Sequence, residues 1–223
     1  MKHSEANMNT HENLAWSRRG LVAALVAAGA GSHSATRSST APAPVNGADS
    51  AALAAQELTR QRLRQRRSPN VALLDHNGRA VRFYDDIMKD RKVVLNVMYS
   101  VCSNVCIPAT RNLIEARRLL ADEAPDLHFV SLTLTPLQDT PAALREYKKL
   151  HGIDERWTFL TGRPEQVERV LRALGFLGSD DTDDLRSHSA MAKVCDERHL
   201  RWSHVNTLLS GRTIARMIRF ELV

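Results

Sequence analysis

The chain has 223 residues, enough for one domain of ordinary size with additional segments, and 43% of them are hydrophobic, enough for a buried core. Its formal charge is +6, but residues 1–67 hold nine Lys and Arg against four Asp and Glu, whereas the rest of the chain holds 22 against 21. The excess positive charge therefore belongs to the N-terminal part, and we expect no nucleic-acid partner for the folded part.

Residues 1–31 are typical of an export signal. Arg18 and Arg19 precede an apolar run over residues 21–31, which is too short for the about 20 residues of a membrane-spanning helix. A cleavage site of the A-x-A type ends at Ala30. The paired arginines resemble a twin-arginine signal, so we expect export to the periplasm and cleavage after Ala30. An uncleaved hydrophobic anchor is the alternative.

Residues 32–68 predict a linker with two parts. The first, residues 32–50, is rich in Ser, Thr, Ala and Pro and indicates a flexible spacer. The second has a helical pattern over residues 51–63 and then a basic run, which consists of Arg60, Arg62, Arg64, Arg66 and Arg67. Two interpretations of this run stay open: peripheral contact with anionic lipid or a partner, and a solvated linker helix.

The remaining residues, 69–223, predict one globular domain in which strands alternate with helices. We expect strands over 71–74, 80–83, 93–99, 127–135, 157–160, 189–194 and 200–205, and helices over 108–122, 141–150, 164–174 and 210–220. This alternation predicts an α/β domain, with a mixed central sheet covered by helices on both faces.

Local turn signals support these boundaries. Asn77-Gly78 is a hairpin turn between the first two strands. Asp139 or Thr140 caps a helix that begins with Pro141, and Gly175 ends the next helix. The four aspartates within residues 179–184 indicate a solvated loop.

Two cysteines, Cys102 and Cys106, follow the valine-rich strand 93–99, and Pro108 in the first turn of the next helix places the start of that helix close to Cys106. We therefore expect both thiols on the loop between the strand end and the helix N-terminus. Unpaired amides and the helix dipole favour the thiolate there. The alternative is that both cysteines are merely small, buried hydrophobic residues. Their position between a strand and a helix instead favours soft-metal binding or thiol–disulfide exchange.

Further features accompany the cysteine pair in a fixed order. They are the Asp139-Thr140-Pro141 helix start, the block Trp157-Thr158-Phe159-Leu160-Thr161-Gly162, and a lone His188 before the last hairpin. Together these features resemble the Sco/SenC family of thioredoxin-like copper proteins, over about residues 69–222. The resemblance implies a thioredoxin-like fold with an N-terminal hairpin extension, and copper ligation by Cys102, Cys106 and His188. Two thiolates suit Cu(I), and imidazole suits both Cu(I) and Cu(II).

The chain departs from the family pattern at several positions. Ser103 and Ile107 stand where family members often have proline. Ser187 replaces the acidic residue that usually precedes the histidine, and Thr135 replaces an aspartate. The last two changes remove negative charge near the expected metal, so the resemblance implies Cu(I) binding more strongly than Cu(II) binding.

The function implied by the resemblance is that of a copper metallochaperone. Cu(I) would be held by Cys102, Cys106 and His188 and passed by ligand exchange to a cuproenzyme, such as the dinuclear copper site in subunit II of cytochrome c oxidase. The alternative is a thiol–disulfide oxidoreductase that keeps such a site's cysteines reduced, with Cys102 and Cys106 as its redox pair. A third interpretation is a binding module with a structural disulfide, which suits an oxidising compartment.

Cys195 is the remaining thiol, and its seven-residue offset from His188 points the two side chains to opposite faces of a strand. This argues against a zinc site made of Cys102, Cys106, His188 and Cys195, although those residue types do build structural zinc sites. We therefore expect Cys195 to be a buried small hydrophobic residue.

Overall fold

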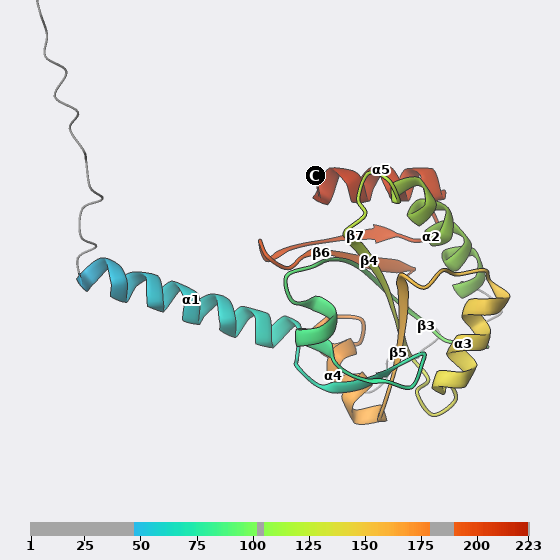
Figure 1. Cartoon of the computed structure of the whole chain (residues 1–223), viewed down its shortest axis with the longest axis horizontal. Coiled ribbons are helices and arrows are strands. Elements are labelled where there is room, and N and C mark those ends of the chain that lie inside the picture. Colours follow the sequence, from blue (N-terminus) through green and yellow to red (C-terminus); the bar gives the residue numbers. More distant parts are fainter. Residues whose placement is uncertain (1–46, 102–104, 179–189, 223) are drawn as a thin grey trace, which may run out of the picture. The chain divides into compact units, whose positions relative to one another are not determined.

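The computed structural model describes residues 47–101, 105–178 and 190–222 (Figure 1). The expected export signal, most of the spacer and the expected loop at 179–184 lie outside these ranges. The elements are α1 (Gly47–Arg67), β1 (Ala72–Asp75), β2 (Ala80–Arg82), the π-helix η1 (Phe83–Met88), β3 (Lys92–Met98), α2 (Cys106–Leu120), β4 (Leu127–Thr133), α3 (Pro141–Leu150), β5 (Trp157–Thr161), α4 (Pro164–Ala173), β6 (Met191–Asp196), β7 (Arg201–Asn206) and α5 (Gly211–Leu222).

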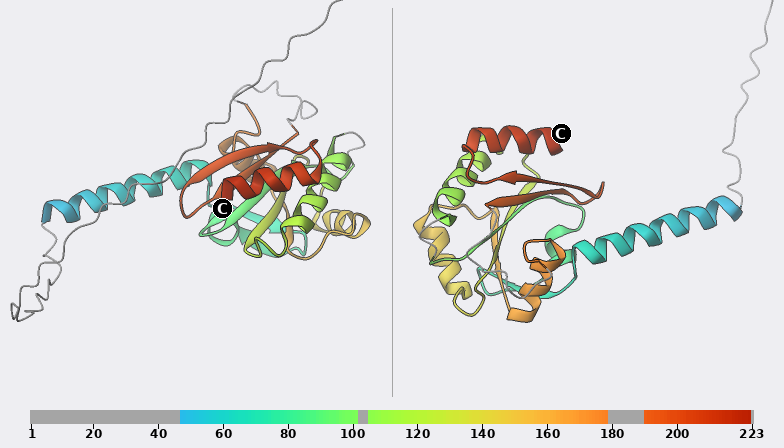
Figure 2. Two further views of the ribbon diagram at one scale, coloured as in Figure 1. Left: turned by 90° about the horizontal axis from the view of Figure 1, so that it is seen from above. Right: turned by 180° about the vertical axis from the view of Figure 1, so that it is seen from behind.

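The strands form one mixed sheet in the order β2-β1-β5-β4-β3-β6-β7. The central strands β3, β4 and β5 run parallel, and every other pairing is antiparallel. Helices cover both faces of the sheet (Figures 1 and 2). The predicted α/β class, with a mixed sheet between two helical layers, is therefore confirmed.

Side chains of β3 alternate between two hydrophobic cores, as expected for a central strand. Val94 and Met98 belong to the core formed with α2, α3 and α5. Val93 and Leu95 belong to the core formed with η1 and α4. All four side chains are at most 1% exposed, so burial on both faces explains why this stretch is continuously apolar.

The predicted strands and helices are present, with ends displaced by a few residues. The hairpin turn has Gly78 at φ +81°, and the end of α4 has Gly175 at φ +69°, so both predicted glycines take the left-handed backbone that favours glycine. The helix start expected close to Cys106 is confirmed, because α2 begins at this residue, although Cys106 is thereby the first helical residue rather than part of the loop. Proline lacks only an amide hydrogen that the first helical turn does not use, so the helix can begin before it.

The C-terminal end of α1 is tied to the domain through Glu197, which is 2% exposed. Its carboxylate accepts hydrogen bonds from Arg64 Nε at 2.8 Å, from the Tyr84 hydroxyl at 3.1 Å and from the Asp90 amide at 2.9 Å. Burial and the neighbouring Glu197 carboxylate raise the pKa of Tyr84 to about 12. Across the described ranges, none of the helices combines the length and the apolar character needed to cross a membrane.

Candidate functional site

Cys106 is the first residue of α2 and is 9% exposed. Its side chain belongs to the core shared by α2, α3 and α5. The preceding residue, Val105, provides no side-chain cap for the helix. A helix N-terminus, with its unpaired amides and the positive end of the helix dipole, is a position that favours anionic ligands, so the placement of Cys106 suits metal binding or disulfide exchange.

Cys102 and His188, the other two predicted ligands, lie outside the described residues. The sheet nevertheless shows where the segments that carry them begin and end. β3 and β6 are antiparallel neighbours, with Asn96 opposite Ala192. The end of β3, which leads to the cysteines, and the start of β6, which follows the histidine, therefore lie at the same edge of the sheet.

A buried carboxylate, Asp139, holds the start of the segment that leads to Cys102. Its Oδ1 accepts hydrogen bonds from the amide of Ser100, at 3.1 Å, and from the hydroxyl of the same residue. Its Oδ2 accepts hydrogen bonds from the hydroxyls of Thr133 and Thr135, the latter at 3.0 Å. Asp139 is 0% exposed, so this carboxylate fixes the exit from β3 against the end of β4.

This role of Asp139 was not found from the sequence, which offered Asp139 or Thr140 as the cap of α3. The structure separates the two residues. Thr140 is the cap, because its Oγ1 accepts a hydrogen bond from the Ala143 amide at 3.2 Å. Thr133 and Thr135 lie at the end of β4, whereas Ser100 follows β3 and is 39 residues away from Asp139, so no local spacing could reveal that the two strand ends share this carboxylate.

A second contact holds α2 against α3 close to Cys106. The hydroxyls of Thr110 and Tyr147 are 2.9 Å apart, within hydrogen-bonding distance in a buried position. Tyr147 also lies beside Phe159, with ring centroids 5.9 Å apart. The first two turns of α2, including Cys106, are thereby fixed to the core.

His76, for which no partner was predicted, is buried. Its Nε2 lies 2.9 Å from Lys148 Nζ, and that amine also donates a hydrogen bond to the Trp157 carbonyl at 2.9 Å. Both side chains are 4% exposed. Burial and the nearby Lys148 lower the pKa of His76, and burial lowers the pKa of Lys148. The pair joins the end of β1 to α3 and β5.

Cys195 lies in the core on the η1 and α4 face of the sheet, whereas Cys106 lies in the core on the other face. It is 1% exposed, and burial, with Glu197 and Asp196 nearby, raises the pKa of its thiol. Within residues 47–101, 105–178 and 190–222, no three His, Cys, Asp or Glu side chains are grouped to hold a metal ion. The expectation that Cys195 is a buried hydrophobic residue agrees with this position.

The sequence model of the SCO1/SenC family matches residues 59–222. The chain belongs to the SCO1/SenC family. One relative is a protein of Stutzerimonas stutzeri that is named as a copper-binding protein. The two sequences are 31% identical over 164 residues, which cover 70% of this chain and 76% of the relative. The family assignment made from the cysteine pair, the helix start and the lone histidine is therefore confirmed.

Solved structures of Sco proteins share the fold. Copper-bound ScoI of Bradyrhizobium japonicum aligns with a TM-score of 0.56 at 23% identity, over 70% of this chain and 99% of the other. BsSco, described as a member of the Sco family of cytochrome c oxidase assembly proteins with a disulfide switch, aligns with a TM-score of 0.56 at 17% identity, over 68% and 90%. The predicted thioredoxin-like fold is confirmed by these neighbours.

Proposed function

We propose that this SCO1/SenC protein is a copper metallochaperone that binds Cu(I) through Cys102, Cys106 and His188. The observation that carries the proposal is the position of Cys106, buried in the first turn of α2 beside the end of β3. A thiolate there is a soft ligand suited to Cu(I). The shared sheet edge of β3 and β6 supports a third ligand from the segment that contains the histidine.

The acceptor that we propose is a cuproenzyme such as cytochrome c oxidase, with copper passed from these ligands to the dinuclear site of subunit II. Copper transfer by ligand exchange requires direct contact between the two proteins. Apolar side chains flank the cysteine positions and face solvent, with Val101 70%, Val105 38% and Ile107 38% exposed. Exposed apolar residues grouped around one segment are typical of a protein contact surface.

We also propose that the protein works in the periplasm after its leader is removed. The motivation is the arginine pair, Arg18 and Arg19, before a short apolar run and the A-x-A site. N-terminal sequencing of the protein purified from its cells is expected to give a chain that starts at Gly31. A full-length chain that only detergent extracts would show an anchor instead.

A second candidate is a thiol–disulfide oxidoreductase that keeps the acceptor's cysteines reduced. The same helix position favours it, because a stabilised thiolate also promotes disulfide exchange. Its redox pair would be Cys102 and Cys106. The two candidates differ at His188, since exchange between sulfurs does not need an imidazole.

Oxidase maturation in cells that carry His188→Ala, compared with Cys102→Ser, separates these candidates. For a copper chaperone we expect both variants to fail. His188→Ala should lower Cu(I) affinity at least about tenfold, since even outer residues of metal sites have effects of that size. The reduction potential of the Cys102–Cys106 pair should stay nearly unchanged. Normal maturation with the histidine variant and failure with the cysteine variant would instead establish the oxidoreductase.

A further inference from the structure

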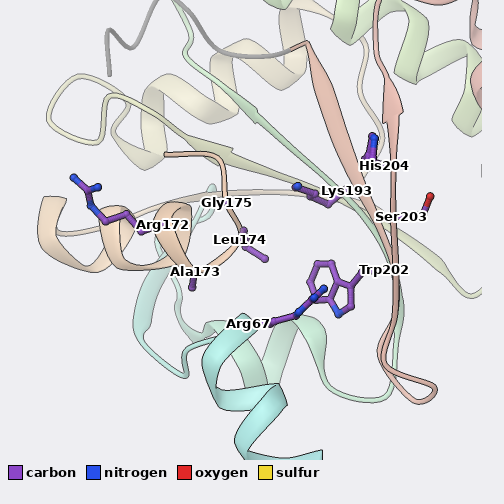
Figure 3. A pocket seen from close by; sticks show the side chains of 9 residues that line it. All are labelled: Arg67, Arg172, Ala173, Leu174, Gly175, Lys193, Trp202, Ser203 and His204. Atoms are coloured by element: carbon purple, nitrogen blue, oxygen red, sulfur yellow. The ribbon is translucent and has the colours of Figure 1, made fainter. Parts of the chain in front are cut away.

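A cavity of about 380 Å³ lies between the end of α1, the end of α4 and the outer strands β6 and β7 (Figure 3). Arg67 comes from α1, Lys193 from β6, and Trp202 and His204 from β7. Trp202 packs against the core on the η1 and α4 face, so the cavity lies across the sheet from Cys106. A volume of this size is within the range of small-molecule sites.

The lining of this cavity is cationic. Among the described residues, Arg67, Arg172, Lys193 and His204 contribute to it, and no Asp or Glu does. The charge of Arg172 is balanced by Glu168, whose Oε1 lies 2.8 Å from Arg172 Nε. Neither Arg67 nor Lys193 takes part in any ion pair between described residues. Among the described residues, two positive charges therefore face this cavity without an ion-paired carboxylate, and Glu197, which lines an adjoining cavity with Arg67, is paired with Arg64 instead.

Both of these cations are held over aromatic rings rather than by acids. The Arg67 guanidinium lies 5.9 Å from the centroid of the Trp202 ring, and Figure 3 shows the two side chains against each other. Lys193 Nζ lies 5.6 Å from the centroid of the Phe176 ring. Aromatic faces attract a cation without neutralising it. The two charges are thus placed in advance and remain available to an anion.

A neighbouring cavity of about 460 Å³ extends the same character along α1 and α4. Arg62, Arg66 and Arg169 line it, no acidic side chain in the described part of the chain does, and it shares Ala173 with the first cavity. The basic run that the sequence showed at the end of the linker is thus continued by an arginine of α4. Surface of one sign raises the local concentration of anions.

We propose that the first cavity is a binding site for a phosphate group, with Arg67 and Lys193 as its charged contacts and Trp202 as the apolar wall. Guanidinium has a planar set of donors that matches phosphate oxygens, and lysine adds a compact second charge. Two unbalanced cations and a histidine suit a doubly charged phosphate monoester better than a single carboxylate. The phosphate could belong to a small free ester or to the headgroup of an anionic lipid.

Binding of glycerol phosphate and of vesicles that contain phosphatidic acid, whose headgroup is a phosphate monoester, to the intact mature protein tests this site. At about 150 mM salt, attraction between distant charges is screened beyond about 8 Å, so saturable binding reports close contact. We expect one of the two probes to bind, and Arg67→Gln with Lys193→Gln together to weaken it at least about tenfold, as loss of two charge-assisted contacts requires. Binding of the soluble ester alone identifies a free ligand, and binding of the vesicles but not of phosphatidylcholine vesicles identifies a headgroup.

The matched control is Arg212→Gln with Arg216→Gln, which removes the same charge from exposed positions on α5, across the sheet. Binding should change less than about twofold in this control, because screening removes the effect of net charge. Copper stoichiometry and thermal unfolding of both double variants should match the wild type, which shows that they are folded. No saturable binding of either probe, equal weakening by the control pair, or tighter binding of succinate than of glycerol phosphate would overturn the proposal.

Discussion

Replacing both Cys102 and Cys106 by serine is expected to remove copper from the reduced protein, which should hold one copper per chain in its wild-type form. Hydroxyl oxygen is a hard ligand and does not replace thiolate for Cu(I). His188 alone would then remain of the three proposed ligands, too few to hold the ion. Metal analysis after reduction and desalting measures this directly.

The matched control for that variant is Cys195→Ser, which removes the third thiol of the chain. Cys195 is 1% exposed in the core on the η1 and α4 face, so its loss should leave the copper content unchanged. A hydroxyl in that core should cost about 1–3 kcal/mol of unfolding free energy. Loss of copper from this control would show that Cys195 is a ligand. A metal-free wild type with a reducible disulfide would favour the oxidoreductase.

Sequence patterns predicted most of the fold because they are local. The alternating apolar residues of a strand, a glycine at a turn and a proline at a helix start each act within a few residues. The order of strands in the sheet depends on residues far apart in the sequence, and so does the environment of Lys148. On an exposed helix this lysine would be solvated, yet it is 4% exposed and bonded to His76 and to the Trp157 carbonyl.

The π-helix η1 was missed for a related reason. Its six residues are too few to establish a helical period, and they follow a hairpin strand without a cap that would mark a boundary. Its three buried side chains are Phe83, Ile87 and Met88. Packing of these residues into the core with α4 provides the energy for the turn.

The sequence predicted those residues of the candidate site whose side chains can bind a metal or exchange disulfides. Thiols between a strand and a helix indicate a soft-metal or redox site, and the family resemblance added His188. Serine and threonine have no such signal, so the network of Ser100, Thr133 and Thr135 around Asp139 became evident only in three dimensions. The residues that position a site are harder to read from sequence than those that bind.

Asp139→Ala is expected to destabilise the fold and also to loosen the cysteine site. Four donors would lose their acceptor, and each buried donor left unpaired costs about 1–3 kcal/mol, so we expect a loss of about 3 kcal/mol after water and rotating hydroxyls satisfy part of them. Ser100, two residues before Cys102, would lose its tether. Cu(I) affinity should therefore fall at least about tenfold, as it does when the shell that supports a metal site is loosened.

Asp139→Asn separates the hydrogen bonds from the charge. The amide oxygen can accept from Ser100, and the amide nitrogen can donate to the hydroxyls of Thr133 and Thr135, which can turn to accept. We therefore expect this variant to lose about 1 kcal/mol and to keep nearly all of its Cu(I) affinity. A large loss of copper in Asp139→Asn would show that the negative charge itself supports the metal.

Glu197→Ala is the control that distinguishes positioning from general stability. Glu197 is as deeply buried, and it accepts three hydrogen bonds at the opposite end of β3, about 20 Å along the strand from the exit held by Asp139. We expect it to cost a similar amount of unfolding free energy with no change in Cu(I) affinity or in the Cys102–Cys106 reduction potential. Chemical denaturation, competitive Cu(I) titration and redox equilibration of Asp139→Ala and Glu197→Ala make the comparison. If the two variants are equally unstable and bind copper equally well, Asp139 acts only as a structural residue; if only Asp139→Ala weakens the metal, it positions the cysteine segment.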